Sequence, residues 1–256
     1  MVSTGPARTR DRRPGREADT RERPGRGADT RERPGRGADT RERILAAAER
    51  LFAEHGIAAV SNRQIGEAAG QSNNYAVGYH FGTKTDLVRA VLRRHNGAME
   101  ERRAAMLAAV GDASGVREWA SCLVRPATEH LASLPAPTWY ARFLAQADTE
   151  PTMRAVVIEE AVAMPSLGPI AEHLFRLAPG VPEEVHRQRT DMCRVLVVHM
   201  LAERERALHE DPAADPAAVW RQTADALVDA LAGLLAAPVT ASRGQPAPHP
   251  PAGRRS

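Results

Sequence analysis

Residues 61–84 read SNRQIGEAAGQSNNYAVGYHFGTK, and this stretch decides the fold. Ser61 and Gln64 form the Ser-x-x-Gln pattern of a capping box, which predicts a short helix that is stopped by Gly70. Ser72 is placed to cap a second short helix. Two short helices joined by a tight turn that contains glycine are typical of a helix-turn-helix, whose second helix enters the major groove of DNA.

The start of that second helix carries the residues that we expect to face the bases. They are Asn73, Asn74 and Tyr75. An asparagine amide both donates to and accepts from adenine, and a tyrosine ring packs on a thymine methyl. Asparagine is also an ordinary residue at a helix start, so this pattern alone leaves a structural role open.

Lys84 is the only lysine in the chain, and it lies in the first turn of the next predicted helix, which Thr83 caps. A cation at that position opposes the helix dipole. We therefore expect an anion such as a DNA phosphate beside Lys84, with a solvated surface lysine as the alternative. Tyr79 and His80, at the end of the preceding helix, are also placed to donate to phosphates, and for Thr83 such a contact is secondary to capping.

Apolar residues at helical spacing extend on both sides of this segment. An amphipathic helix is predicted over residues 40–55, and Phe81 is expected in a core with Phe52. Beyond Thr83 a long helix runs to about residue 110. Further helices are predicted over about 115–134, 138–147, 152–177 with an interruption near Pro165 and Pro169, 183–209 and 216–236. Because aromatic residues are few and alanine and leucine recur, we predict an all-α fold.

The two ends of the chain differ from the rest. Residues 14–43 contain three copies of a ten-residue repeat with an Asp-x-x-Glu capping pattern, and only the third copy, Asp39 with Glu42, precedes apolar residues. We predict a disordered Arg-rich arm over residues 1–38 and a disordered Pro-rich tail over 238–256. An alternative is that the arm enters a DNA minor groove, although its acidic residues dilute its positive field.

Charge and composition narrow the function classes. The net charge is +5 over residues 1–43, +2 over 44–95 and −4 over 96–256, which favours a nucleic-acid-binding module joined to another domain. Cys122 and Cys193 stand alone and are expected as core thiols. We find no catalytic set, no metal-ligand spacing, no apolar span and no signal peptide, and we expect a cytoplasmic protein that is not an enzyme and needs no cofactor.

Three spaced motifs resemble the DNA-binding domain of the TetR family of transcriptional regulators. They are TRERILAAAERLFAEHG over residues 40–56, QIGEAAG over 64–70 and YHFGTKTDL over 79–87. The resemblance is dense over 40–95 and elsewhere covers the helical architecture only. Between Gly70 and Phe81 the chain has one residue more than the commonest family pattern.

The resemblance implies a DNA-binding domain over residues 39–95 and a helical effector-binding and dimerisation domain over 96–237. It implies base contacts near Asn73–Tyr75 and phosphate contacts from a set of polar residues around the helix-turn-helix. That phosphate set is Ser61, Tyr79, His80, Thr83 and Lys84.

The helical domain offers candidate pocket and interface residues. An effector pocket, for which ordinary core packing is the alternative, is predicted from Trp119, Cys122, Trp139, Phe143, Met164, His173 and Met192. Two apolar stripes on the helix over 216–236 suggest that one faces the chain's own core and the other a partner; a single broad core-facing stripe is the alternative. Candidate dimer contacts are Val195, Val198, Leu227, Leu231 and Leu234.

The hypothesis is a homodimeric transcriptional repressor that binds a palindromic DNA operator and responds to an unknown small-molecule effector. The alternative is a helical interaction module or small-molecule-binding protein whose helix-turn-helix does not read DNA. An enzyme that uses the helical cavity lacks any supporting motif.

Overall fold

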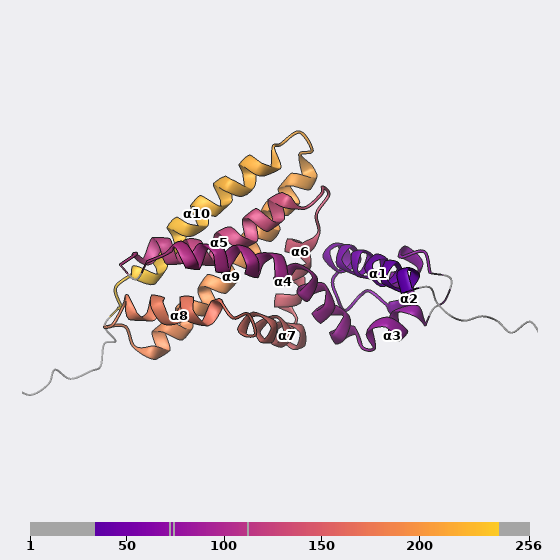
Figure 1. Cartoon of the computed structure of the whole chain (residues 1–256), viewed down its shortest axis with the longest axis horizontal. Coiled ribbons are helices and arrows are strands. Elements are labelled where there is room, and N and C mark those ends of the chain that lie inside the picture. The colour runs from indigo at the N-terminus through magenta and orange to yellow at the C-terminus, as the bar shows by residue number, and fades with distance from the viewer. Residues whose placement is uncertain (1–33, 72, 74, 112, 241–256) are drawn as a thin grey trace, which may run out of the picture.

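The computed structural model describes residues 34–240 except 72, 74 and 112, and within these residues it contains ten helices and no strand (Figure 1). The helices are α1 Pro34–His55, α2 Asn62–Ala68, α3 Ala76–Phe81, α4 Lys84–Ala109, α5 Val116–Ser133, α6 Tyr140–Thr149, α7 Pro151–Val162, α8 Leu167–Arg176, α9 Glu183–Glu210 and α10 Pro216–Ala236. The predicted all-α fold is confirmed. In this part of the chain no helix is both long and apolar enough to cross a membrane.

The molecule is elongated, with α1–α3 at one end, α5–α10 at the other and α4 running between them (Figure 1). Buried Leu87 and Val91 on α4 belong to the same core as buried Met99 further along that helix. Phe52 on α1 stacks on Phe143 on α6, with ring centroids 6.2 Å apart. The expected domain limit at residues 95 and 96 therefore lies inside a continuous helix and a continuous core.

The sequence prediction for α10 needs a correction. One predicted stripe runs through Val219, Thr223, Leu227, Leu231 and Leu234, and the other through Trp220, Ala224, Val228, Leu231 and Leu235. Leu227 of the first and Trp220 of the second are both buried, as is Leu231, which belongs to both. α10 packs against α5 on one side and α9 on the other, so both stripes face the chain's own core. This is the single broad core-facing surface that was the alternative, and it leaves no apolar stripe of α10 for a partner.

Two helix starts also differ from prediction. α1 begins at Pro34 and not near Thr40, because proline is well tolerated at the first helical position; Asp39 therefore lies inside the helix and does not cap it. α3 begins at Ala76, with Tyr75 at its N-cap, and so is shorter than predicted. The other expectations for the two ends of the chain, over residues 1–33 and 241–256, lie outside the described residues.

The interruption predicted in the helical domain is confirmed at Pro165, which lies between α7 and α8. Pro169 lies in the first turn of α8, where a missing backbone N–H costs nothing. Capping boxes at Ser61 and Thr83 are also confirmed.

A buried carboxylate positions α6. Glu205, on α9, is 0% exposed, and its two oxygens accept from the backbone N–H groups of Ala141 at 3.2 Å and Arg142 at 2.9 Å. The Arg142 guanidinium donates to the same carboxylate at 3.3 Å. α6 has no side-chain cap of its own, so α9 supplies one.

Candidate nucleic-acid interface

The helix-turn-helix is built from two short helices and a glycine turn. Ser61 Oγ accepts from the Gln64 N–H at 3.3 Å, and the Ser61 N–H donates to Gln64 Oε1 at 2.8 Å, which starts α2. Gly70, with φ +68°, follows α2 in the left-handed region that favours glycine. The chain then turns into α3, which packs on α2 through Val77.

One face of α3 is open to solvent. Tyr75, at the N-cap, is 82% exposed and Tyr79 is 78% exposed, whereas Ala76, Val77 and Phe81 are buried. Tyr75 and Tyr79 are four residues apart, so their side chains lie on the same side. Large aromatic side chains held out in water beside a turn are suited to contacting bases and phosphates.

Gly78 lies on the same open face, and sequence reasoning missed it. A methyl group added there would have no heavy atom within 4 Å, and the backbone is ordinary helix. Glycine weakens a helix interior relative to alanine, so neither packing nor backbone geometry explains this residue. The signal was available in the sequence as a glycine in the middle of a predicted helix.

Of the predicted base-reading asparagines, the structure describes Asn73 and not Asn74. Asn73 is exposed, and its Oδ1 accepts from the Tyr75 N–H at 2.9 Å in a turn that precedes α3. One lone pair of Oδ1 is thus used within the turn, so Asn73 offers a base chiefly its amide N–H groups. Asn74 lies outside the described residues.

The predicted phosphate contacts also have local partners. Ser61 Oγ donates to Gln64 Oε1 at 2.8 Å, and Thr83 Oγ1 donates to Asp86 Oδ2 at 2.6 Å. Both hydroxyl hydrogens therefore belong to capping boxes. His80 is half-buried, and its ring stands nearly perpendicular to that of Tyr79, with the ring centroids 5.2 Å apart. Tyr79, 78% exposed, thus presents its side chain to solvent without a role in a capping box.

The explanation given for Lys84 needs correction. Its ammonium donates to the carbonyl oxygen of Val60 at 2.7 Å and to that of Ile57 at 3.0 Å, both in the turn between α1 and α2. These contacts supply the negative partners that the sequence argument sought in a phosphate. Lys84 therefore fastens the start of α4 to the α1–α2 turn, and a phosphate is not needed to account for it.

Replacing Lys84 by methionine is expected to lower the free energy of unfolding by about 2 kcal/mol, because two backbone carbonyls lose a charged donor. Urea unfolding of both proteins measures the difference. The exposed Arg221, replaced by methionine, controls for the lost charge. Unchanged stability together with a shallower salt dependence of DNA binding would restore a phosphate as the main partner of Lys84.

Two arginines that sequence reasoning did not single out lie near the helix-turn-helix. Arg63 is exposed on α2 and pairs with Glu67 at 2.8 Å. The Arg41 guanidinium lies over the buried Phe81 ring, 4.9 Å from its centroid. Such isolated surface arginines carry no local pattern that distinguishes them from the many others in this chain.

Four of the predicted pocket residues lie close together where α4, α5 and the start of α8 meet. The ring of Trp119 stacks on His173, with centroids 3.8 Å apart, and Trp119 Nε1 is buried with no hydrogen-bond partner in the described part of the chain. Arg103 Nε donates to the Cys122 carbonyl at 3.3 Å, and Arg103 Nη1 lies 3.5 Å from Met164 Sδ. Trp119, Cys122, Met164 and His173 therefore surround one region.

The other predicted pocket residues lie elsewhere. Phe143 is buried against Phe52 of α1, far along the core. Trp139 lines a groove beside α1 and carries the Arg142 guanidinium over its ring at 4.4 Å. Met192 is 52% exposed on α9. Helical spacing alone could not separate these residues from the others, because it does not show which part of the fold each residue contacts.

The predicted dimer contacts are largely internal. Val198, Leu227 and Leu231 are buried within the chain, which excludes them from a surface that a partner could cover without unfolding. Val195 is 43% exposed, and Leu234 is half-buried.

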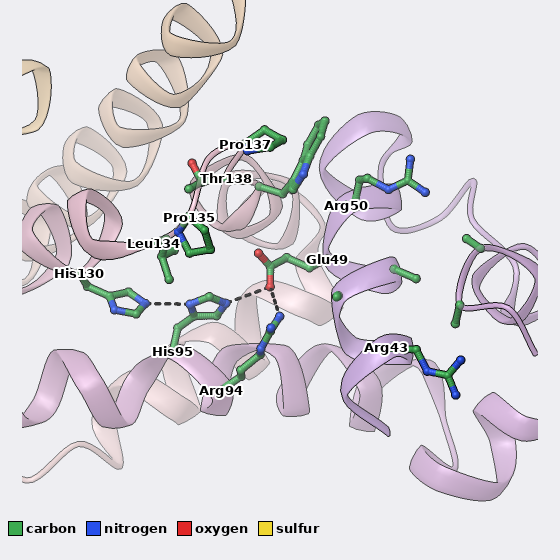
Figure 2. Close-up of a pocket in the computed structure, with 15 residues that line it drawn as sticks. Arg43, Glu49, Arg50, Arg94, His95, His130, Leu134, Pro135, Pro137 and Thr138 are labelled. Carbon is green, nitrogen blue, oxygen red and sulfur yellow. Dashed lines mark hydrogen bonds and ion pairs between the residues drawn. The ribbon is translucent and has the colours of Figure 1, made fainter. Parts of the chain in front are cut away.

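A buried polar chain connects α1, α4 and α5 (Figure 2). His130 Nε2 lies 2.8 Å from His95 Nδ1, and His95 Nε2 lies 2.9 Å from Glu49 Oε2. Arg94 Nη1 donates to the same Glu49 oxygen at 3.1 Å. Burial, helped by His95 and Arg102, lowers the pKa of His130 to about 4.

This pKa predicts a pH dependence of stability. An unfolded histidine titrates near 6.5, so between pH 6.5 and 4 the unfolded chain binds a proton that the folded chain does not. Above pH 6.5 the titration of His130 does not lower the free energy of unfolding. As the pH falls below 6.5 this free energy decreases, by about 2 kcal/mol at pH 5 from His130 alone. Urea unfolding of wild type and His130→Leu at pH 7 and pH 5 tests this. The variant is expected to lose less stability than wild type on acidification, and equal losses would refute the assignment.

Comparison with solved structures gives several matches of low sequence identity. NalD, described as the secondary repressor of the MexAB-OprM multidrug efflux pump in Pseudomonas aeruginosa, is 23% identical, with a TM-score of 0.49 over 76% of this chain and 96% of that one. A putative tetR family transcription regulator from Shewanella sp. PV-4 is 21% identical, with a TM-score of 0.48 over 74% of this chain and 95% of that one. No curated protein sequence matches the chain.

Two family models match the chain and together span more than half of it. Residues 44–91 match the model of bacterial regulatory proteins of the tetR family, and these residues include the whole helix-turn-helix. Residues 121–233 match the tetracyclin repressor-like C-terminal domain, which agrees with the helices beyond α4. The chain therefore belongs to the TetR family of bacterial regulatory proteins, DNA-binding regulators of transcription.

Proposed function

We propose that the chain is a ligand-responsive transcriptional repressor that acts as a homodimer on a palindromic operator in the cytoplasm. The observation that carries the proposal is the open face of α3, formed by Tyr75, Gly78 and Tyr79 beside the α2–α3 turn. The description of the matching C-terminal model as repressor-like supports repression. In this proposal residues 39–95 bind DNA and residues 96–237 bind the effector and the partner.

The proposal divides the DNA contacts by what each side chain has to offer. Tyr75, with Asn73 and Asn74, reads base edges, and Asn73 does so as a donor. The hydroxyl of Tyr79 donates to a phosphate. Ser61, His80, Thr83 and the remaining N–H of Lys84 contribute at most secondary phosphate contacts, since their groups already have partners or are half-buried.

The partner surface is proposed on the exposed side of α9. Met192 and Val195 lie one turn apart there, exposed by 52% and 43%, and replace the buried positions predicted from sequence. Two copies related by a two-fold axis would place these apolar side chains against each other. Val195→Glu is expected to convert the dimer to monomer in sedimentation experiments, while Glu203→Gln on the same helix leaves it a dimer.

The effector is proposed to bind beside Trp119. The buried Nε1 of this residue lacks an acceptor among the described residues, and its ring is held by the stack on His173. A small molecule that supplies a hydrogen-bond acceptor would satisfy that donor. Binding there would change the spacing of the two α3 helices and release the operator.

The decisive experiment is a selection of bound duplexes from random DNA with the purified protein, followed by salt titration of the enriched sequence. An enriched palindrome bound by a dimer supports the proposal, since half-sites must lie about one helical turn apart or a multiple of it. Tyr79→Phe is expected to weaken binding to specific and random DNA alike, and Asn73→Ala to weaken the specific sequence by about 1–3 kcal/mol more than random DNA.

Failure to enrich any sequence, with weak binding at all salt concentrations, would refute the repressor proposal. It would favour the alternative, a helical module or small-molecule-binding protein that does not read DNA. Equal losses for Tyr79→Phe and Asn73→Ala on both kinds of DNA would refute the division of contacts while leaving DNA binding in place.

A further inference from the structure

A groove of about 590 Å³ lies between the DNA-binding domain and the helices behind it (Figure 2). It runs across α1, from the turn between α5 and α6 on one side to the end of α2 on the other. This volume falls within the range of small-molecule sites, which is roughly 300–1,000 Å³. The groove is separate from the Trp119 region, because none of Trp119, Cys122, Met164 and His173 lines it.

The groove exists because small side chains of α1 and α2 face larger, rigid side chains of the α5–α6 turn. On the DNA-binding domain the lining residues include Ala46, Ala47 and Ala69, and the opposite wall includes Pro137 and Trp139. The Trp139 ring has fixed neighbours, since the Arg142 guanidinium lies over it at 4.4 Å and the His209 ring meets it at 4.4 Å. The groove therefore offers a flat apolar wall opposite small side chains.

The charge around this wall is positive. Glu49 is the only acidic residue among those that line the groove, and it already accepts from Arg94 and lies within hydrogen-bond distance of His95. Arg43 and Arg50, both on α1, also line the groove. The surplus charge available to a ligand is therefore that of two guanidinium groups.

These two arginines have no carboxylate at hydrogen-bond distance within the described residues. Arg43 donates only to neutral oxygens, the Asp39 carbonyl at 3.4 Å and Thr40 Oγ1 at 3.1 Å. Arg50 Nη1 forms an ion pair with Glu54 Oε2 at 3.7 Å, which is longer than a hydrogen bond and joins two partly exposed side chains. A guanidinium with neutral partners or one loose ion pair can bind a carboxylate or sulfonate through paired N–H groups.

We propose that this groove binds a flat organic monoanion, an aromatic carboxylate or sulfonate, with its ring system against Trp139 and its anionic group at Arg43 and Arg50. The walls belong to both ends of the molecule, so an occupant fixes how the DNA-binding domain sits on the helices behind it. The site goes beyond the proposed function, because the effector site proposed above lies at Trp119.

The buried polar chain makes this coupling direct. His130 and His95 line the groove, and the chain of contacts continues to Glu49 on α1 (Figure 2). An occupant that displaces α1 relative to α5 must lengthen or break one of these contacts. Occupancy of the groove and the position of α1 are therefore linked through the interior as well as through the groove walls.

The test is a fluorescence titration of the full chain with 8-anilinonaphthalene-1-sulfonate, in the absence of DNA. Wild type is expected to bind one probe per chain saturably, and 1-naphthoate is expected to displace it. Arg50→Glu should weaken binding at least tenfold, and Ala46→Phe, which fills the groove from an exposed position, should abolish it. Arg221→Glu, an exposed charge reversal on α10, should leave the affinity within twofold of wild type.

Two results would overturn the proposal. One is wild-type affinity for the probe in both Arg50→Glu and Ala46→Phe, which would place the probe elsewhere, for example near Trp119. The other is displacement of the probe by 1-naphthylmethylammonium as effectively as by 1-naphthoate, which would remove the role of the arginines. Circular dichroism establishes that each variant is folded, and because no DNA is present, the result is independent of operator binding.

Discussion

Glu205→Ala is expected to lower the free energy of unfolding by about 4 kcal/mol. The carboxylate is 0% exposed and accepts from two backbone N–H groups at the start of α6 and from the Arg142 guanidinium. Removing it leaves these buried donors, one of them charged, without their acceptor. For a chain of this size the melting temperature should fall by roughly 10 °C.

The consequence reaches the DNA-binding domain through α6. Phe143 on this helix stacks on Phe52 of α1, so a loosened α6 start weakens the packing that joins the two ends of the molecule. Thermal unfolding followed by circular dichroism measures the effect. Glu203→Ala, two residues away on α9, removes an exposed carboxylate that pairs with Arg206 and is expected to cost less than about 0.5 kcal/mol. Similar losses for the two variants would show that Glu205 does not cap α6.

Local patterns in the sequence were sufficient for most helix limits. Ser61 and Thr83 act within three residues of their partners, so the capping boxes and the helices that they start could be read directly. Gly70 and Gly82 mark the ends of α2 and α3 for the same reason, since both adopt a positive φ. The all-α fold follows from these signals and from the spacing of apolar residues.

Contacts between distant residues could not be read in this way. The carbonyl groups that accept from Lys84 lie 24 and 27 residues earlier in the chain. The backbone N–H groups that donate to Glu205 lie 63 and 64 residues earlier. From local spacing Lys84 is a cation without a partner, and Glu205 is one of several charged residues near the end of its helix. Only the fold shows that both are satisfied internally.

Because contacts between distant residues cannot be read from local patterns, the sequence also could not show which apolar surfaces are covered. The stripes of α10 look like two faces because the sequence does not show that α5 and α9 cover both. By contrast, Tyr75 and Tyr79 could be assigned to one open face, because the apolar Ala76, Val77 and Phe81 define the buried side of a very short helix. The sequence therefore indicates which face of α3 is open, whereas the partner of each side chain on that face depends on the fold.

Gly78→Ala is expected to raise stability and to lower operator affinity. An alanine in the interior of a helix is favoured over glycine by up to about 1 kcal/mol, and the added methyl has no heavy atom within 4 Å. Operator binding, in contrast, should weaken tenfold or more, and Gly78→Leu should weaken it further. The reason is space: a helix with its side chains is about 10–12 Å wide and the major groove is about 12 Å wide, so a close approach leaves no room on the inserted face.

The matched control is Gly97→Ala, because Gly97 is exposed in the interior of α4 and an added methyl there also meets nothing within 4 Å. Both variants should gain similar stability in urea unfolding, but only Gly78→Ala should lose affinity for the selected operator. This separation removes folding as a cause, since the variant that binds less well is the more stable protein. If Gly78→Ala binds the operator as tightly as Gly97→Ala does, the face of Tyr75 and Tyr79 does not enter the groove closely, and contacts to bases must be sought from the turn before α3.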